Sequence, residues 1–243
     1  VTYWYKFSHE GIDIDLVNDE DTMAGHFLHI LHGKEPSDLH RKVMDVSLIL
    51  YAEHEFNAST FTARVCASTM SDIHSCVVAA IGSLRGPLHG GANEKAMELI
   101  ENWTSKEEAK SNIIEMLEKK EKVMGFGHAV YSIKDPRNAV IKDYAKQLSE
   151  LAENDTLYIV AEEVEKVMAD EKKMFANADF FHAPAYFYMG IPTMLFTPIF
   201  VMSRVSGWAA HCMEQRSNNR IIRPSADYIG VETSDWVDIS ERS

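Results

Sequence analysis

The sequence predicts an all-α fold. Apolar residues recur at helical spacing through nearly the whole chain, and no pair of segments shows the alternation of apolar and polar residues that marks paired strands. Residues that cap or break helices separate these periodic segments. Of the 243 residues, 46% are hydrophobic and 25% are charged, so the chain can bury one large core, or one core with a smaller satellite domain.

Four helices are predicted in the first part of the chain, at residues 21–32, 38–52, 59–71 and 72–84. A turn at 33–37 separates the first two, and Gly86 with Pro87 ends the fourth. Another helix is expected to begin near Ala92.

Capping signals mark two helix starts in the middle of the chain. Thr104, with Glu107 three residues later, is predicted to form a capping box before an amphipathic helix with a solvated charged face. Asp135 and Pro136 suit the N-cap and first position of a helix that runs to about residue 152. A further helix is expected at 157–168.

No residue between Asp179 and Arg204 carries a formal charge, and a membrane span needs roughly 20 apolar residues. Pro184, Pro198 and the Gly and Pro residues at 190–192 interrupt this stretch. We therefore expect two buried helices, joined at 190–192.

Lys and Glu are more frequent at 94–173 than in the apolar sections on either side. This shift in composition predicts a discontinuous organisation. A large helical domain would combine residues 1–90 and 191–243, and a smaller helical domain would consist of residues 91–190.

The net charge of −13 excludes nucleic acid and anionic membranes as expected partners, because both require a basic face. The three cysteines, Cys66, Cys76 and Cys212, are odd in number and lack CxxC spacing. They indicate core residues in a reducing compartment, rather than a disulfide framework or a zinc site.

Two histidines lie in glycine-rich segments that a ligand could approach closely: His89 in GPLHGGANE and His128 in GFGHAVY. For His89, an imidazole satisfied by the backbone of a tight turn explains the pattern equally well. The GxG before His128 has no preceding strand, so it does not indicate a dinucleotide site.

Asp179 lies among aromatic residues in NADFFHAPAYF, where partial desolvation would raise its pKa and strengthen it as a base. An N-cap for the following helix is the alternative interpretation. Two imidazoles and a carboxylate are the groups needed to remove a proton from carbon and stabilise the resulting charge.

Arg204 and Arg223 lie in apolar segments, where an unpaired guanidinium group would be costly to bury. Each could form a structural ion pair, but together they indicate a bound multi-carboxylate. His26, His29 and His32 recur at helical spacing, but no carboxylate or thiol completes an obvious metal-binding constellation with them, so we favour a polar helix flank over a metal site.

Several motifs together resemble the citrate synthase family: EHEFNASTFTARV, GPLHGGANE, GFGHAVY followed by DPR, NADFF, FTPIFVMSRVSGWAAHCMEQ and NNRIIRPSADYIG. The likeness extends over residues 3–230. It implies a citrate synthase-like helical fold and a Claisen-type condensation of an acyl-CoA with oxaloacetate. Hydrolysis of the thioester would then release CoA.

The resemblance also implies a role for each matching residue. Asp179 would remove the α-proton of the thioester, His89 would hydrogen-bond the thioester oxygen, and His128 would polarise the ketone of oxaloacetate. His54, Arg137 and Arg204 would hold oxaloacetate together with His128, and Arg223 would reach in from a second subunit. Contacts with CoA are implied for Val123, Met124, Gly125, Phe126, Gly127 and Asn177.

Within this family, the sequences of three segments most resemble those of 2-methylcitrate synthases, which use propionyl-CoA: AEHEFNAST, EQRSNNRIIRPSA and WYKFSHEG. A citrate synthase that uses acetyl-CoA, or an enzyme with dual specificity, is the alternative. The resemblance implies a homodimer, with acyl-CoA as substrate and CoA as product. Neither a tightly bound cofactor nor a metal is implied.

Family members usually carry a further N-terminal helical portion, which this sequence lacks. An inactive interaction or regulatory module is therefore the hypothesis of another class, although the complete acid/base set argues against it. Exposed apolar surface is expected where that portion would pack. A cytoplasmic location is expected, with the mitochondrial matrix as the alternative because the chain does not begin with Met.

Overall fold

The computed structural model describes residues 1–233 and 235–242, and within them the chain is helical without a sheet. The prediction of an all-α fold is confirmed. The elements are α1 (Thr2–Tyr5), η1 (Lys6–Glu10), α2 (Met23–His32), α3 (Asp38–Tyr51), α4 (Ala58–Ser68), α5 (Ile73–Leu84), α6 (Ala92–Ile100), α7 (Lys106–Glu118), α8 (Pro136–Leu151), α9 (Thr156–Lys172), α10 (Ala178–Tyr188), η2 (Thr193–Leu195), α11 (Phe196–Ser217) and η3 (Ile239–Glu241).

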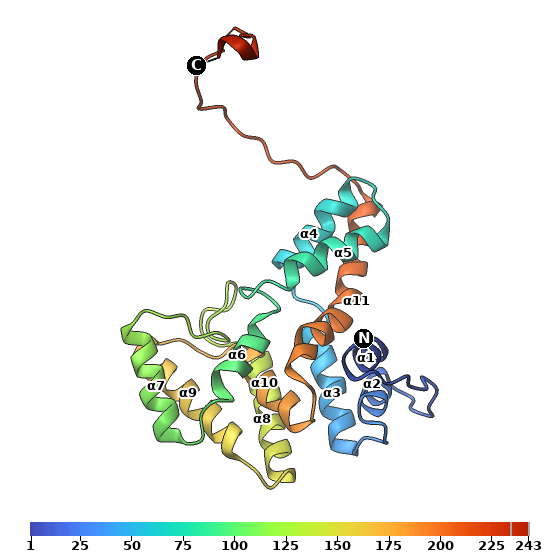
Figure 1. Cartoon of the computed structure of the whole chain (residues 1–243), viewed down its shortest axis with the longest axis vertical. Coiled ribbons are helices and arrows are strands. Elements are labelled where there is room, and N and C mark those ends of the chain that lie inside the picture. Colours follow the sequence, from blue (N-terminus) through green and yellow to red (C-terminus); the bar gives the residue numbers. More distant parts are fainter. Residues whose placement is uncertain (234, 243) are drawn as a thin grey trace.

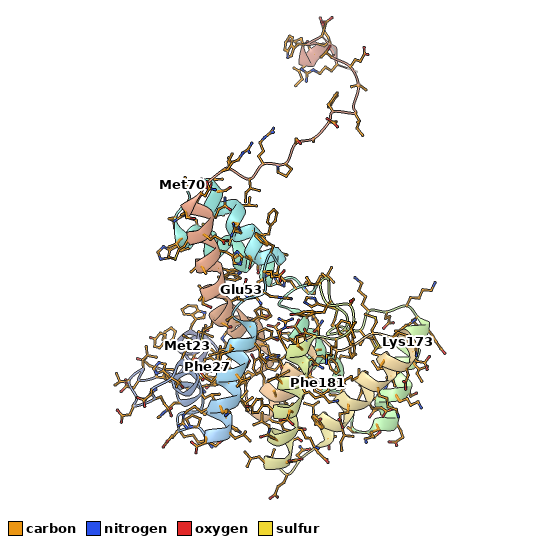
Figure 2. The ribbon with its side chains drawn as sticks, turned by 180° about the vertical axis from the view of Figure 1, so that it is seen from behind. Met23, Phe27, Glu53, Met70, Lys173 and Phe181 are labelled. Carbon is orange, nitrogen blue, oxygen red and sulfur yellow. The ribbon has the colours of Figure 1, made fainter. Side chains whose placement is uncertain are left out.

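The helices form two groups that meet along α3, α10 and α11 (Figure 1). In one group α10 packs on α8 and α6, and α7 packs on α9. In the other, α2 packs on α3, and the long helix α11 contacts α3, α4 and α5. Met70, after α4, lies at the tip of the second group, where the C-terminal tail begins to extend away, and Lys173, after α9, lies in the first group (Figure 2).

The first group contains α6 to α10, which all lie within the predicted small domain. Its helices α8 and α10 also contact α3, so the two groups share packing. The boundaries at 91 and 190 therefore stay a prediction. Residues 234 and 243, assigned to the large domain by that prediction, lie outside the described residues.

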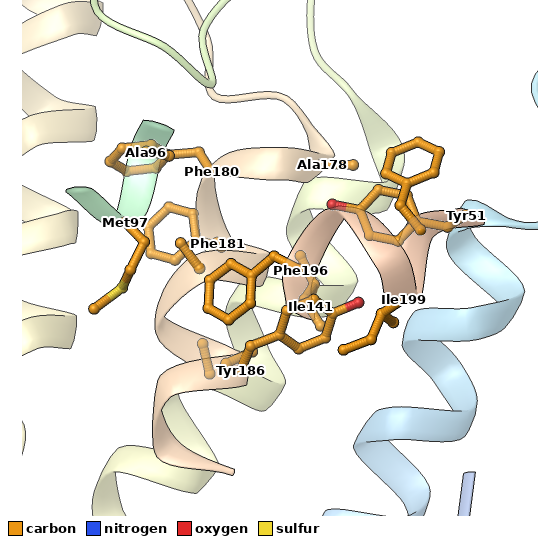
Figure 3. Close-up of a cluster of buried hydrophobic side chains, with 14 of the residues drawn as sticks. Tyr51, Ala96, Met97, Ile141, Ala178, Phe180, Phe181, Tyr186, Phe196 and Ile199 are labelled. Carbon is orange, nitrogen blue, oxygen red and sulfur yellow. The ribbon is translucent and has the colours of Figure 1, made fainter. Parts of the chain in front are cut away.

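Helix α10 is the centre of the apolar core. Its aromatic residues Phe180, Phe181 and Tyr186 have no exposed surface. They pack against side chains from α3, α6, α8 and α11, as Figure 3 shows. The Tyr186 ring also meets Phe196 edge-on, with 5.0 Å between ring centroids. Helix α10 therefore joins the two groups of helices through one continuous core.

The predicted helices are found close to their expected bounds, because caps and apolar periodicity act locally. Asp72 and Asp135 cap α5 and α8 through hydrogen bonds to backbone N–H groups. The capping box before α7 was predicted one residue too early. Ser105, not Thr104, has the extended backbone of an N-cap and accepts from Glu108 N at 3.2 Å. The carboxylate of Glu108 accepts from Thr104 N instead.

The N-terminal segment 2–10 forms α1 and η1, which periodicity did not predict. Its short aromatic run is too brief for a helical pattern to be recognised. Trp4 and Phe7 are 66% and 51% exposed. Residues 223–233 form an extended tail that leaves the body of the molecule (Figure 1), where Ile229 is 95% exposed.

The three cysteines are unpaired, and Cys76 and Cys212 are buried between α4, α5 and α11, as predicted for core residues. No helix among the described residues has both the length and the apolar character required to cross a bilayer. In the same residues, no cluster of three His, Cys, Asp or Glu side chains could hold a metal ion. His26 contacts Asn18 at 3.2 Å, and His29 faces Glu20 at 3.7 Å.

Replacing Phe181 by Ala is expected to lower the free energy of unfolding by about 3–5 kcal/mol, because it removes a fully buried aromatic ring. Phe187 on the same helix is 44% exposed, so Phe187→Ala is the matched control, with a loss of about 1 kcal/mol or less. Urea denaturation measures both. Equal losses would contradict the central position of Phe181.

Candidate active site

A cleft of about 1090 Å³ lies where the two groups of helices meet. Its lining comes from the end of α3, the turns before α4 and α6, the 120–130 loop and the N-terminal ends of α8 and α10. Two residues of α11, Phe200 and Arg204, complete it. The predicted site residues that line this cleft are His54, His89, Val123, Met124, Gly125, Phe126, Gly127, His128, Arg137, Asn177, Asp179 and Arg204.

Asp179 lies in the first turn of α10, and its Oδ1 accepts a hydrogen bond from the Tyr51 hydroxyl at 2.8 Å. Burial raises the pKa of Asp179 to about 6, against the opposing effects of Tyr51, Arg137 and Arg204. The alternative interpretation of Asp179 as an N-cap was wrong. Asn177 is the N-cap, and its Oδ1 accepts from the backbone N–H of Asp179 at 3.0 Å.

His89 lies within the tight turn at 86–91, where close backbone packing requires glycine at positions 90 and 91. A Cβ atom on Gly91 would lie 2.8 Å from the carbonyl oxygen of Arg85. The Nε2 atom of His89 accepts from the backbone N–H of Ser59 at 3.3 Å. Burial, and then the charge of Arg204, lower the pKa of His89 to about 4. At neutral pH the ring is therefore uncharged, and its proton lies on Nδ1.

His128 and His54 are in direct contact, with 2.9 Å between their Nε2 atoms. The Nδ1 atom of His128 accepts from the backbone N–H groups of Val130 and Tyr131, at 3.0 and 3.2 Å. Its proton is therefore on Nε2, which donates to His54. Burial lowers the pKa of both rings, that of His54 to about 4, and Arg137 adds to the effect. Both histidines are neutral at pH 7.

Two guanidinium groups, those of Arg204 and Arg137, bring positive charge to the cleft beside Asp179. Arg204 on α11 is 1% exposed, and its Nε donates to the carbonyl oxygen of Tyr51 at 2.6 Å. Its Nη1 has no hydrogen-bond partner within the part of the chain that the structure describes. Burial lowers the pKa of Arg204 to about 10, so it remains charged. A buried donor without a partner, at the wall of a cleft, is suited to bind an anion.

Arg137 is held by the carboxylate of Asp135, with Nε–Oδ1 and Nη2–Oδ2 distances of 3.0 and 2.7 Å. Asp135 is buried and also accepts from the backbone N–H of Ala178. Although burial acts in the opposite direction, hydrogen bonds from Arg137 keep the pKa of Asp135 below its usual value. This ion pair fixes Arg137 beside Asp179.

The loop at 123–127 forms another wall of the cleft. Backbone hydrogen bonds hold it against the segment before α10: Gly127 N donates to Phe175 O, and Asn177 N donates to Gly125 O, both at 2.9 Å. The side chain of Asn177 also donates to Gly127 O at 3.0 Å. Gly125 has a φ of +85°, and a Cβ atom on it would lie 2.8 Å from the Cβ of Phe180. Lys120, Lys122 and Lys172 also line the cleft.

Arg223 is the one predicted site residue outside the lining of this cleft. It is exposed on the C-terminal tail, which extends away from the helices (Figure 1). Its predicted position in the site of a second subunit remains a prediction.

Sequence reasoning missed Tyr51 and Ser59, which contact Asp179 and His89. It treated Asp135 only as a helix cap. Tyr51 continues the apolar periodicity of α3 and therefore resembles an ordinary core residue. No local signal distinguishes it, because its partner is 128 residues away.

Comparison with known proteins identifies the family. Residues 1–225 match the family model of the citrate synthase C-terminal domain. The chain belongs to the citrate synthase family. It is 64% identical, over 242 residues, to the 2-methylcitrate synthase of Shewanella oneidensis, covering all of this chain and 64% of that relative. It is 49% identical to citrate synthase 2 of Bacillus subtilis, covering 91% of this chain and 59% of the relative.

The fold matches a solved citrate synthase closely. The enzyme of the thermophilic archaeon Thermoplasma acidophilum, in a ternary complex with carboxymethyl coenzyme A and oxaloacetate, superposes with a TM-score of 0.91. Sequence identity is 33%, with 99% of this chain and 65% of that chain covered. The chain thus spans a little under two thirds of the length of these citrate synthase family members.

Substituting Gly125 by Ala is expected to destabilise the protein by about 1–3 kcal/mol, because the new methyl group meets Phe180 at a positive φ. At Gly82, inside α5, a Cβ atom would meet nothing within 4 Å beyond its own helix, so Gly82→Ala is the control and should be neutral or slightly stabilising. Urea denaturation of both variants tests this. A loss at position 82 but not at 125 would contradict the loop geometry.

Proposed function

We propose that this chain carries the active site of a 2-methylcitrate synthase, which condenses propionyl-CoA with oxaloacetate and then hydrolyses the thioester to release CoA. One observation carries the proposal. A carboxylate with a raised pKa and two neutral histidines line the same cleft as a buried guanidinium group that has an unused donor. The 64% identity to a 2-methylcitrate synthase supports the acyl preference.

Removal of the α-proton is the demanding step. A thioester α-proton is far less acidic than a carboxylic acid, whose usual pKa is about 4, so a carboxylate alone is an inadequate base. Asp179 would accept the proton while the Nδ1–H of His89 donates to the thioester oxygen. Because Ser59 occupies Nε2 of His89, this donor is fixed before substrate arrives. The developing negative charge is then stabilised as an enol or enolate.

The nascent enol would attack the ketone of oxaloacetate, polarised by the Nε2–H of His128. In the absence of substrate this donor is occupied by His54, so oxaloacetate would replace that contact. Arg137 and the free Nη1 of Arg204 would bind the substrate carboxylates, with His54 beside them. Arg223 of a second subunit would also contact oxaloacetate.

The acyl-CoA would enter along the 123–127 loop, whose glycines bring backbone close to the ligand. Val123, Met124, Gly125, Phe126, Gly127 and Asn177 would contact it. The phosphates of CoA are anionic, and Lys120, Lys122 and Lys172, which also line the cleft, would attract them. Closure between the two groups of helices after oxaloacetate binds would limit wasteful hydrolysis of the thioester.

Citrate synthase activity with acetyl-CoA is the second candidate, supported by the 49% identity to a citrate synthase. The two acyl groups differ by one methylene, which changes selectivity by only about 1–3 kcal/mol. Activity with both donors therefore fits the same site.

We also propose a homodimer. The N-terminal helix and the C-terminal tail expose large apolar side chains, among them Trp4, Phe7 and Ile229, and such surface favours association. A second subunit would bring its copy of Arg223 to the cleft. The three unpaired cysteines support a reducing, cytoplasmic location.

Thiol release tests the function directly. The purified chain is expected to release CoA from propionyl-CoA with oxaloacetate, and more slowly from acetyl-CoA, as measured by the ratio of the two kcat/KM values. Asp179→Asn is expected to abolish release while leaving oxaloacetate binding, measured by calorimetry, nearly unchanged. Asp143→Asn, at an exposed position of α8, is the control and should behave like the unmodified protein.

Release with neither donor would favour an inactive interaction module. A higher kcat/KM for acetyl-CoA would favour citrate synthase. Substantial turnover by Asp179→Asn would remove this residue from the role of base.

The pH dependence of kcat/KM follows from the pKa of Asp179. The base must be ionised, and burial raises its pKa to about 6, so kcat/KM should fall tenfold per pH unit below 6 and reach a plateau above it. His54 and His89 have pKa values lowered to about 4 and stay neutral over this range. Steady-state rates between pH 5 and 8 measure the profile. A constant kcat/KM from pH 5 to 7 would contradict it.

A further inference from the structure

Tyr51 is among the residues that line the cleft, and its hydroxyl group lies against the proposed base. It donates to Oδ1 of Asp179 at 2.8 Å, and the tyrosine itself has no exposed surface. Figure 3 shows the hydroxyl pointing toward the N-terminal end of α10, where Ala178 is labelled. The two residues come from α3 and α10, so the contact joins helices from both groups.

The ring of Tyr51 is held in one orientation by its aromatic neighbours. His182 and Phe200 stack on it with centroid distances of 4.1 and 3.9 Å and interplanar angles of 25° and 29°. The carbonyl oxygen of Tyr51 accepts from Arg204 Nε. One residue therefore contacts both the proposed base and the guanidinium group assigned to oxaloacetate.

Tyr51 can act only as a hydrogen-bond donor toward Asp179. Burial, and then the negative charge of Asp179, raise the pKa of the phenol well above its usual value, so the hydroxyl remains protonated. The other charged groups that influence the Asp179 carboxylate are Arg137 and Asp135 at the start of α8, and Arg204 on α11. Neither guanidinium group forms a hydrogen bond with Asp179 among the described residues, so Tyr51 is its side-chain donor there.

We propose that Tyr51 is a positioning residue for Asp179, and this inference rests on the proposed function. Its hydroxyl holds Oδ1, which leaves Oδ2 to accept the α-proton and keeps the carboxylate ionised at neutral pH in spite of its partial burial. Tyr51 itself does not contact the reacting atoms. A carboxylate without this donor would be protonated over a larger part of the pH range in which the enzyme works.

Tyr51→Phe removes the donor and keeps the stacked ring. Loss of a hydrogen bond to a charged group should raise the pKa of Asp179 by about one unit or more. The acidic limb of the kcat/KM profile should move to higher pH by the same amount. Activity is thus expected to fall about tenfold or more at pH 5.5, and much less at pH 8.5, while the KM for oxaloacetate is little changed.

The pKa of Asp179 can be measured without turnover, by carboxyl ¹³C NMR of protein labelled at aspartate, with Asp179→Asn to identify the signal. Tyr186→Phe is the matched control. Tyr186 is also fully buried, but its hydroxyl bonds to Ser47 at 2.6 Å, so this variant should leave the titration of Asp179 unchanged. Circular dichroism establishes that each variant is folded.

The unmodified protein provides a readout that needs no variant. Because the Tyr51 hydroxyl donates to Asp179, the Cζ chemical shift of Tyr51 should change with pH, with the same midpoint as the titration of Asp179. A Cζ chemical shift that does not change over this titration overturns the proposal. An unchanged pKa of Asp179 in Tyr51→Phe also overturns it. A shifted pKa in a protein that releases no thiol would support the hydrogen bond and contradict the proposed function.

Discussion

A partly buried carboxylate at the junction of two helical groups is the feature on which the proposed site depends. Asp179 sits at the first turn of α10, the helix that also forms the centre of the core. Burial raises its pKa to about 6, which makes it a stronger base than an exposed carboxylate and still leaves it ionised at neutral pH. The packing of α10 thus accounts both for the aromatic core and for the raised pKa of Asp179.

Neutral histidines complete this arrangement. Backbone N–H groups occupy Nε2 of His89 and Nδ1 of His128, and these contacts leave the opposite nitrogen of each ring as a donor. Burial lowers both pKa values, so neither ring adds positive charge beside the two guanidinium groups. Donors fixed before substrate binds need no reorganisation during reaction, which is the condition for effective stabilisation of an enolate.

The loop at 123–127, which belongs to the proposed CoA-binding surface, lies next to the proposed base. Its backbone is bonded to the segment just before α10, and Gly125 rests on Phe180, the residue after Asp179. A ligand in contact with this loop would therefore lie against the same helix that carries the proposed base. Arg223 lies apart on the extended tail, and in the proposed dimer it would contribute a guanidinium group to the site of the second subunit.

Interactions between residues close in the sequence made most of the fold, and much of the candidate site, predictable from the sequence. Apolar periodicity and caps such as Asp72 and Asp135 act within a few residues, so they mark helices directly. Glycines around His89 and His128 mark close backbone approach for the same reason. The contacts of Tyr51 with Asp179, and of Ser59 with His89, join residues 128 and 30 positions apart. Only tertiary packing decides such contacts, and through them the proton positions and pKa values, because burial and charge depend on residues that are distant in the chain.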